Sequence, residues 1–300
     1  TDDTVTWEDM IHGRISFEGS QLSDPILIRE DGRPIYTLSS VVDDLDMGVT
    51  HIIRGDDHIA NTAVQIQLIE ALGHDKNTFT YAHTPWIIAA DGSGLSKRYG
   101  SLSIESLRNQ GILPIAIHSL LATLGTSDSI HLAQDIEQLI EEFDIKKINK
   151  SASKFSIEDL KNLNKQAIQR MSLDQAMPYL KDRIPRPVTQ DFWHIIRDNS
   201  ESFDDVKDWW ESIYQDIPPF TEEKEYLEIA LECLPSQPWT EETWDQWTSA
   251  LREKTGRKGK TLFMPLRQAL TGKTYGPEMK KVLPLIGYEK TRKRLEQTCP

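Results

Sequence analysis

The chain has 300 residues, of which 38% are hydrophobic and 27% charged, and its formal net charge is −13. This composition is typical of a globular protein with two or three domains, and it excludes collagen-like and low-complexity chains. No run approaches the roughly 18 apolar residues of a membrane span, so we expect no membrane partner. Two cysteines without CxxC spacing exclude a thiolate metal site and favour a cytoplasmic protein.

The first region of the chain, up to about residue 90, alternates strand-like and helix-like segments. Residues 25–29 and 34–38 are β-prone runs on either side of Asp31-Gly32. This pattern predicts two paired strands joined by a tight turn.

A strand, a helix and a second strand follow. Residues 49–53 form a short β-branched run, and residues 86–90 form another apolar run. Between them, apolar residues at helical spacing over 64–72 predict a helix that ends at Gly73. Together these segments predict a βαβ unit of a parallel sheet, whose ligand crevice lies beyond the carboxyl ends of its strands.

From about residue 102 the chain is mainly helical. Residues 117–124, closed by Gly125, and residues 136–143 each carry an apolar face at helical spacing. Six of the eight tryptophans fall within residues 193–247. Tryptophans at this density predict the core of a helix bundle rather than a platform for stacked bases.

Charge is distributed unevenly over the last hundred residues. Residues 199–250 carry 14 acidic side chains and two lysines, whereas residues 251–300 carry 13 basic and four acidic side chains. The basic end is either a phosphate-binding face or a solvated helical surface, and composition leaves both interpretations open.

A basic loop between glycines is the first candidate for chemistry. Residues 92–100 read GSGLSKRYG, in which Lys97 and Arg98 supply positive charge and glycines allow backbone N–H groups to approach a phosphate. The loop fits neither GxxxxGK[ST] nor GxGxxG, and an ordinary surface turn is the alternative.

Three further candidates lie upstream of this loop. Arg54, at a strand end, can pair with a substrate carboxylate or form a salt bridge with Asp56 or Asp57. Tyr36 offers a hydroxyl to a pocket or is a half-buried strand aromatic. His58 is either an acid or base, or a hydrogen-bond partner of its acidic neighbours.

Three stretches together resemble one family, the glutamyl-tRNA synthetases of class I. Residues 31–58 read DGRPIYTLSSVVDDLDMGVTHIIRGDDH and match the signature of these enzymes. Residues 95–100, LSKRYG, resemble their form of the KMSKS loop. Residues 255–272, TGRKGKTLFMPLRQALTG, are similar to the C-terminal domain of the bacterial enzymes. The Gly-Leu-Ser-Lys-Arg form looks most like the second glutamyl type of alphaproteobacteria.

The resemblance implies an α/β plus all-α fold. Residues 1–38 are expected to end an inserted acceptor-binding domain, and residues 39–90 to form the second half of a Rossmann-type catalytic domain. Residues 91–165 are expected to hold the KMSKS-like loop and a stem-contact region. Residues 166–300 are expected to form a helical anticodon-binding domain.

The resemblance also implies a reaction: ATP with Mg²⁺ activates glutamate as an adenylate, and the glutamyl group passes to tRNA(Glu), with tRNA(Gln) left open as a second acceptor. Tyr36 and Arg54 are expected to bind glutamate. Lys97 is the expected catalytic residue of an ATP-binding loop. The expected members of that loop are Leu95, Ser96, Lys97 and Arg98, and the expected tRNA phosphate contacts are Arg257, Lys258, Lys260 and Arg267. No metal ligand is assigned, and a monomer is expected.

Three departures from the family pattern qualify this prediction. Gly94 stands where many relatives have the first lysine of the loop, and Ser40 stands where some have asparagine. No HxGH motif occurs in the 300 residues. The chain is therefore expected to be the carboxy-terminal two-thirds of such a ligase and not to form the adenylate unaided. The alternative is a non-catalytic tRNA-binding fragment or paralogue.

Overall fold

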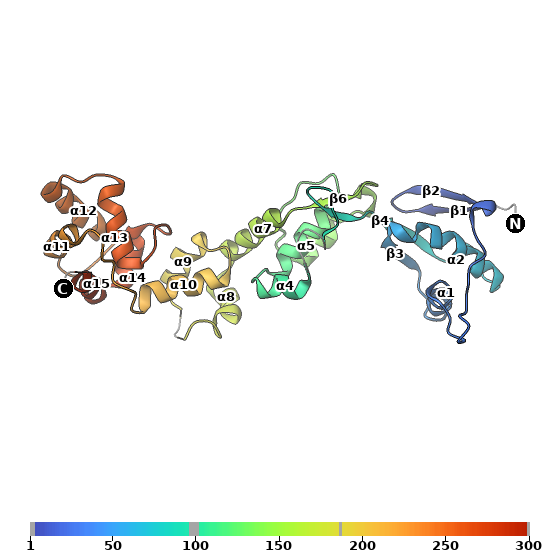
Figure 1. Ribbon diagram of the computed structural model, residues 1–300, viewed down its shortest axis with the longest axis horizontal. Helices are drawn as coiled ribbons and strands as arrows, with labels where there is room; N and C mark the ends of the chain where they lie inside the picture. Colours follow the sequence, from blue (N-terminus) through green and yellow to red (C-terminus); the bar gives the residue numbers. More distant parts are fainter. Residues whose placement is uncertain (1–3, 96–101, 186–187, 299–300) are drawn as a thin grey trace. The chain divides into compact units, whose positions relative to one another are not determined.

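A computed structural model describes residues 4–95, 102–185 and 188–298. The chain divides into two compact units. The first comprises Thr1–Ser106 and Pro114–Leu160, and the second comprises Leu107–Leu113 and Lys161–Pro300. Figure 1 draws both units, coloured along the sequence, with many of their helices and strands labelled.

A four-stranded sheet organises the first unit, in the order β2-β1-β4-β3. A hairpin of β1 (Thr4–Asp9) and β2 (Gly13–Glu18) flanks β4 (Thr80–Thr84), which runs parallel both to β1 and to β3 (His51–Gly55). The helix α2 (Ile59–Ala71) connects β3 to β4, so these elements form a parallel βαβ unit whose first strand and helix are the predicted ones.

The second strand of that unit is not the one expected. Residues 87–89 do form a strand, β5 (Ile87–Ala89), but β5 pairs in parallel with β6 (Ser153–Phe155) in a separate two-stranded sheet. The partner of β3 is β4, in which Tyr81, Ala82 and His83 are all buried. The threonines and the histidine of β4 interrupt its apolar run, so hydropathy alone did not predict this strand.

The expected strand over residues 34–38 is wrong beyond Ile35. The antiparallel pairing is limited to one bridge, between Ile28 and Pro34, and the helix α1 (Tyr36–Asp46) starts immediately afterwards. Apolar residues at positions 38, 41, 42 and 45 recur at helical spacing, which gives α1 a face for the core.

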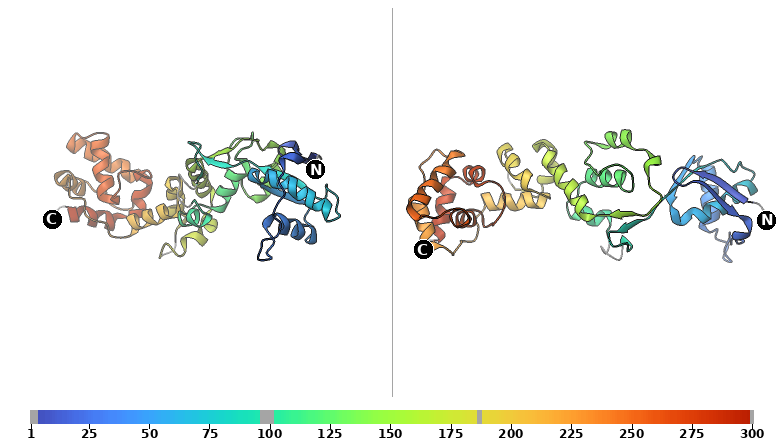
Figure 2. Two further views of the ribbon diagram at one scale, coloured as in Figure 1. Left: turned by 45° about the vertical axis from the view of Figure 1, so that its right-hand side comes forward. Right: turned by 90° about the horizontal axis from the view of Figure 1, so that it is seen from above.

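One apolar core joins the sheet to α1 and α2. Its buried members come from β1, α1, α2, β4 and the residue before β4, and they are Val5, Trp7, Val41, Ala63, Ile66, Ile69, Phe79 and Tyr81. In Figure 2 the hairpin, α1 and α2 can be followed from two further directions. Short 3₁₀ helices cover Gly19–Gln21 and Asp56–His58. The 3₁₀ helix Asp56–His58 therefore joins the carboxyl end of β3 to α2.

Residues 104–147 are mainly helical, as predicted. The helices are α4 (Ile104–Asn109), α5 (Pro114–Thr123), α6 (Ile136–Glu142) and a 3₁₀ helix (Ile145–Lys147). The helices expected over 117–124 and 136–143 are therefore confirmed as α5 and α6. Gly125, with φ +77°, follows α5, a left-handed conformation that glycine adopts without strain.

Helices build the described part of the chain from residue 157 onward. They are α7 (Ile157–Arg170), α8 (Leu173–Leu180), α9 (Gln190–Ile196), a 3₁₀ helix (Arg197–Asn199), α10 (Phe203–Tyr214), α11 (Lys224–Glu232), α12 (Glu242–Thr255), α13 (Lys260–Thr271), α14 (Met279–Ile286) and α15 (Tyr288–Thr298). Five tryptophans at positions 193, 209, 210, 244 and 247 are buried here, which confirms the predicted bundle core.

The predicted fold class, α/β followed by all-α, is confirmed. The four-segment division at residues 38, 90 and 165 stays a prediction. The structure adds that β1 and β2 share a sheet and a core with β3 and β4. Among the described residues, no helix combines the length and the apolar character needed to cross a membrane.

Candidate functional site

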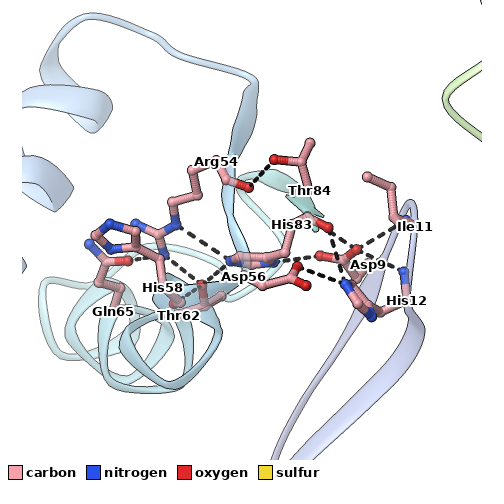
Figure 3. A network of polar contacts seen from close by, with 10 residues as sticks. All are labelled: Asp9, Ile11, His12, Arg54, Asp56, His58, Thr62, Gln65, His83 and Thr84. Atoms are coloured by element: carbon pink, nitrogen blue, oxygen red, sulfur yellow. Dashed lines mark hydrogen bonds and ion pairs between the residues drawn. The ribbon is translucent and has the colours of Figure 1, made fainter. Parts of the chain in front are cut away.

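Four side chains hold Arg54 at the carboxyl end of β3. Three of them, Thr62, Gln65 and His83, are drawn in Figure 3. The Nη1 of Arg54 donates to the Tyr36 hydroxyl at 3.1 Å, and its Nε faces Nε2 of His83 at 3.4 Å. Its Nη2 donates to Thr62 Oγ1 at 2.5 Å and to Gln65 Oε1 at 2.6 Å. Thr62 and Gln65 are three residues apart on α2, so both face the guanidinium from one side of the helix.

These contacts leave part of the guanidinium free. A guanidinium carries five N–H groups, and among the described residues one hydrogen of Nη1 has no acceptor. The Tyr36 hydroxyl accepts from Arg54, so its own hydrogen is also available to a ligand. A carboxylate can therefore accept one hydrogen bond from Arg54 and another from Tyr36.

The alternative interpretation of Arg54, a salt bridge to its acidic neighbours, is wrong. Asp56 pairs instead with Nε2 of His12 at 2.9 Å, and Asp57 lies 3.7 Å from Nε2 of His58. No described carboxylate makes an ion pair with Arg54. Its positive charge is thus not neutralised locally, which suits the capture of an anion.

Asp44 on α1 is near enough to respond to Arg54 through space. Burial raises the pKa of the Asp44 carboxyl, the charge of Arg54 opposes this rise, and the neighbouring Asp43 adds to it. The pKa is raised overall.

Tyr36 is not the strand aromatic of the alternative reading, because it is the first residue of α1 and is 50% exposed. Its ring lies 5.4 Å from the ring of His58. Ser40, one turn further along α1, accepts from Nε2 of Gln65 at 2.7 Å. Ser40 therefore supports the glutamine that holds Arg54.

One ring nitrogen of His58 has no hydrogen-bond partner in the described part of the chain. Its Nδ1 is buried without a hydrogen-bond partner there, and its ion pair with Asp57 is long. The interpretation of His58 as a well-paired neighbour of two aspartates is therefore wrong for Nδ1. No contact joins its ring nitrogens to Arg54.

Three members of the predicted ATP loop, Ser96, Lys97 and Arg98, lie outside the described residues. Leu95 is described and half-buried. The turn before it is well defined, because Asp91 accepts from the backbone N–H and the hydroxyl of Ser93, and Gly94 bridges back to Ile88 in β5. The role of the loop stays a prediction.

The four residues predicted to contact tRNA phosphates differ in their exposure and in the partners that they already have. Lys258 and Lys260 are exposed. Arg257 pairs with Glu223 at 2.7 Å and stacks over the Tyr226 ring at 4.3 Å. Arg267 donates to the backbone carbonyl of Pro277, and burial lowers its pKa. The two lysines are therefore better suited than the two arginines to meet a phosphate.

Sequence reasoning overlooked Asp9, Thr62, Gln65 and His83 as site residues. The spacing of Thr62 and Gln65 on one helix face was a usable signal. No local signal pointed to Asp9 and His83, which lie 74 positions apart in the sequence and meet through strand pairing.

No group of three or more His, Cys, Asp or Glu side chains that could hold a metal ion occurs within 4–95, 102–185 and 188–298.

Comparison with known proteins decides the family. A family model described as tRNA synthetases class I (E and Q), catalytic domain, matches residues 1–162, more than half of the chain. The chain belongs to this family of class I tRNA synthetases. A second model, described as an anticodon binding domain, matches residues 157–299. The resemblance drawn from the sequence motifs is thereby confirmed.

Curated relatives match nearly the whole chain. The chain is 43% identical over 297 residues to Glutamate–tRNA ligase 2 of Gluconobacter oxydans, covering 98% of this chain and 66% of the relative. It is 45% identical to Glutamate–tRNA ligase 1 of Brucella canis and 46% identical to Glutamate–tRNA ligase of Azospirillum brasilense, with 97% of this chain covered in both. The chain spans 64% and 65% of the lengths of these two relatives.

Solved structures agree on the fold. A glutamate tRNA ligase from Elizabethkingia meningosepticum, in complex with its amino acid, has a TM-score of 0.82 at 24% identity. Glutamate-tRNA synthetase from Elizabethkingia anophelis has a TM-score of 0.80 at 26% identity. Each comparison covers 99% of this chain and 66% of the solved chain.

Proposed function

We propose that this chain is the part of a glutamate–tRNA ligase that binds the glutamate side chain and the tRNA. The single observation that carries the proposal is the pair of Arg54 and Tyr36 beyond a parallel strand, with one donor free on each and no described carboxylate on the arginine. In open α/β sheets ligands bind beyond the carboxyl ends of the strands. A cation with a neighbouring hydroxyl suits a carboxylate ligand such as the glutamate side chain.

The geometry favours glutamate over glutamine. A carboxylate accepts from both Arg54 and Tyr36 and gains the attraction of an unneutralised positive charge. An amide of the same shape offers a single acceptor oxygen and no charge.

ATP, with Mg²⁺, belongs to the same proposal through the family. Adenylate formation proceeds largely by positioning and by positive charge at the phosphates, and Lys97 is the residue that we assign to this task. Ser96 and Arg98 are assigned to shaping the loop around it. The tRNA of the proposal is tRNA(Glu), with tRNA(Gln) open as a second acceptor, and the matched anticodon-binding family supports a tRNA partner.

Binding measurements on the 300-residue chain test the proposal. Calorimetric titration is expected to show L-glutamate binding at least about tenfold more tightly than L-glutamine, the effect of a charged hydrogen bond. Fluorescence anisotropy is expected to show binding of tRNA(Glu). Arg54→Met is expected to abolish glutamate binding and to leave tRNA binding and the circular dichroism spectrum unchanged.

The outcomes separate the two candidate functions. Binding of tRNA without measurable binding of glutamate would favour the alternative, a non-catalytic tRNA-binding protein. Equal affinity for glutamate and glutamine would contradict the role of Arg54.

A further inference from the structure

A buried carboxylate and imidazole lie directly behind Arg54. The side chains of Asp9, at the end of β1, and His83, on β4, are both 0% exposed, and Asp9 Oδ2 lies 2.6 Å from His83 Nδ1 (Figure 3). The pairing of β1 with β4, in the register Asp9 to Tyr81, brings these residues together. Neither residue was predicted from the sequence as a site residue. Both side chains are fully buried, so neither contacts a ligand at the free donors of Arg54 and Tyr36.

Backbone donors fix the carboxylate of Asp9. Its Oδ1 accepts from the N–H groups of Ile11, His12 and His83 at 3.0, 3.0 and 3.3 Å. Burial raises the pKa of Asp9, but the hydrogen bonds from the His83 ring and from these backbone groups outweigh it, so the pKa lies below its ordinary value. Asp9 is therefore an ionised group that can only accept hydrogen bonds.

An acceptor at Nδ1 decides where the imidazole of His83 carries its hydrogen. Because Asp9 cannot donate, a hydrogen lies on Nδ1. Nε2 accepts from the Nε–H of Arg54 and therefore presents a lone pair. That lone pair faces Nε of Arg54 at 3.4 Å and the hydroxyl of Thr62 at 2.9 Å. With the opposite tautomer, the lone pair of Nδ1 would face the ionised Asp9 at 2.6 Å, so two acceptors would meet, and Nε of Arg54 would lose its acceptor.

We infer that Asp9 and His83 are positioning residues for Arg54. Asp9 fixes the tautomer of His83, and His83 anchors Nε of the guanidinium while Thr62 and Gln65 anchor Nη2. The planar group then has a single orientation, in which the free donor of Nη1 lies beside the Tyr36 hydroxyl. The inference deepens the proposed function, because glutamate is the ligand for which this orientation is held.

The substitution Asp9→Asn tests the tautomer directly. An asparagine can keep its oxygen on the three backbone N–H groups only by turning its NH₂ toward Nδ1 of His83. The ring must then accept at Nδ1 and carry its hydrogen on Nε2, so Arg54 loses its acceptor. Nitrogen-15 NMR of the imidazole and of the arginine Nε–H groups reports both changes in the 300-residue chain.

In the unsubstituted chain we expect the Nδ1–H tautomer of His83 and slow solvent exchange of the Arg54 Nε–H. In Asp9→Asn we expect the Nε2–H tautomer, faster exchange at Arg54 and a loss of glutamate affinity of about tenfold or more. Asp43→Asn, the same change of charge on α1 at an exposed residue, is the matched control and should change none of these signals.

Two results would overturn the inference. One is an Nε2–H tautomer in the unsubstituted chain, a measurement that needs no variant and is unaffected if Asp9→Asn fails to fold. The other is a folded Asp9→Asn variant with an unchanged His83 tautomer and unchanged Arg54 exchange. If the tautomer and the exchange behave as expected but the unsubstituted chain binds no glutamate, the positioning of Arg54 is supported and the proposed function fails.

Discussion

Arg54 shows how a single side chain acquires a function from its neighbours. An isolated arginine on a strand end has many rotamers, and ordering it costs roughly 2 kcal/mol of side-chain entropy. Here the side chain is ordered before any ligand binds, because it forms hydrogen bonds with Tyr36, Thr62, Gln65 and His83. A ligand carboxylate therefore meets a donor that is already oriented.

The basic residues of the second unit give a prediction at the same scale. The exposed Lys258 and Lys260 are expected to contact tRNA phosphates, whereas the Glu223 ion pair already occupies Arg257. We expect the double substitution to alanine at 258 and 260 to weaken tRNA binding. It should also reduce the slope of log K against log salt by about 1.5, because each phosphate contact contributes about 0.7 to 0.9.

Lys207→Ala is the matched control for this measurement, because Lys207 lies in an i,i+4 pair with Glu211 on α10. An unchanged salt slope in the double variant would contradict the assignment of the two lysines.

The residues offered to the ligand were predictable from the sequence, but the buried residues that position Arg54 were not. Arg54 and Tyr36 follow from motif and position in the chain. Asp9 and His83 have no local pattern, because their contact depends on β1 lying beside β4, a pairing between strands 71 or more positions apart. Sequence periodicity carries no information about which distant strands become neighbours.

At the scale of elements, Arg294 links the ends of several helices. This residue of α15 is 3% exposed, and its guanidinium donates to the carbonyl oxygens of Leu270, Ile213 and Gln215. These carbonyls lie in the last turn of α13 and at the end of α10, where helices leave acceptors unsatisfied. Burial lowers the pKa of Arg294 to about 10, and the charge of Asp216 opposes this. The arginine remains charged at neutral pH.

The substitution Arg294→Met is expected to destabilise the second unit. It keeps the apolar stem and leaves three carbonyls without their charged donor, at a cost of about 3 kcal/mol in the free energy of unfolding. Urea unfolding followed by tryptophan fluorescence reports on this unit, because six of the eight tryptophans belong to it.

Arg292→Met is the control for Arg294→Met, because Arg292 is exposed and forms a surface ion pair with Glu296. Equal unfolding midpoints for the two variants would contradict the capping role of Arg294.

Helices with a regular spacing of apolar residues were predictable from the sequence. The strand β4, which is defined by its pairing with other strands, was not. The helices α2, α5 and α6 follow from apolar spacing, and a glycine shortly after α2 and α5 marks their ends. The strand β4 did not stand out, because its Thr and His residues break the apolar run although three of its five residues are buried. The start of α1 at Tyr36 was missed because Pro34 and Ile35 continue a β-prone run.

At the scale of the whole molecule, two divisions of the chain agree. The compact units separate near residue 160, apart from the short segment Leu107–Leu113. The two matched families meet between residues 157 and 162. The model of the class I catalytic domain thus covers the described strands of the first unit, and the model of the anticodon binding domain covers most of the second. The four-domain division and the expected inability of the 300 residues to form the adenylate unaided stay predictions.

The most direct test of the central claim is to watch the guanidinium of Arg54 while ligands are added. Nitrogen-15 spectra of the arginine side chains are recorded during titration with L-glutamate and then with L-glutamine, and Arg54→Met assigns the signal. We expect glutamate to shift the Arg54 resonances saturably and to slow their exchange, and glutamine at equal concentration to leave them nearly unchanged. An Arg54 signal that does not respond to glutamate, or that responds equally to both amino acids, would contradict the account.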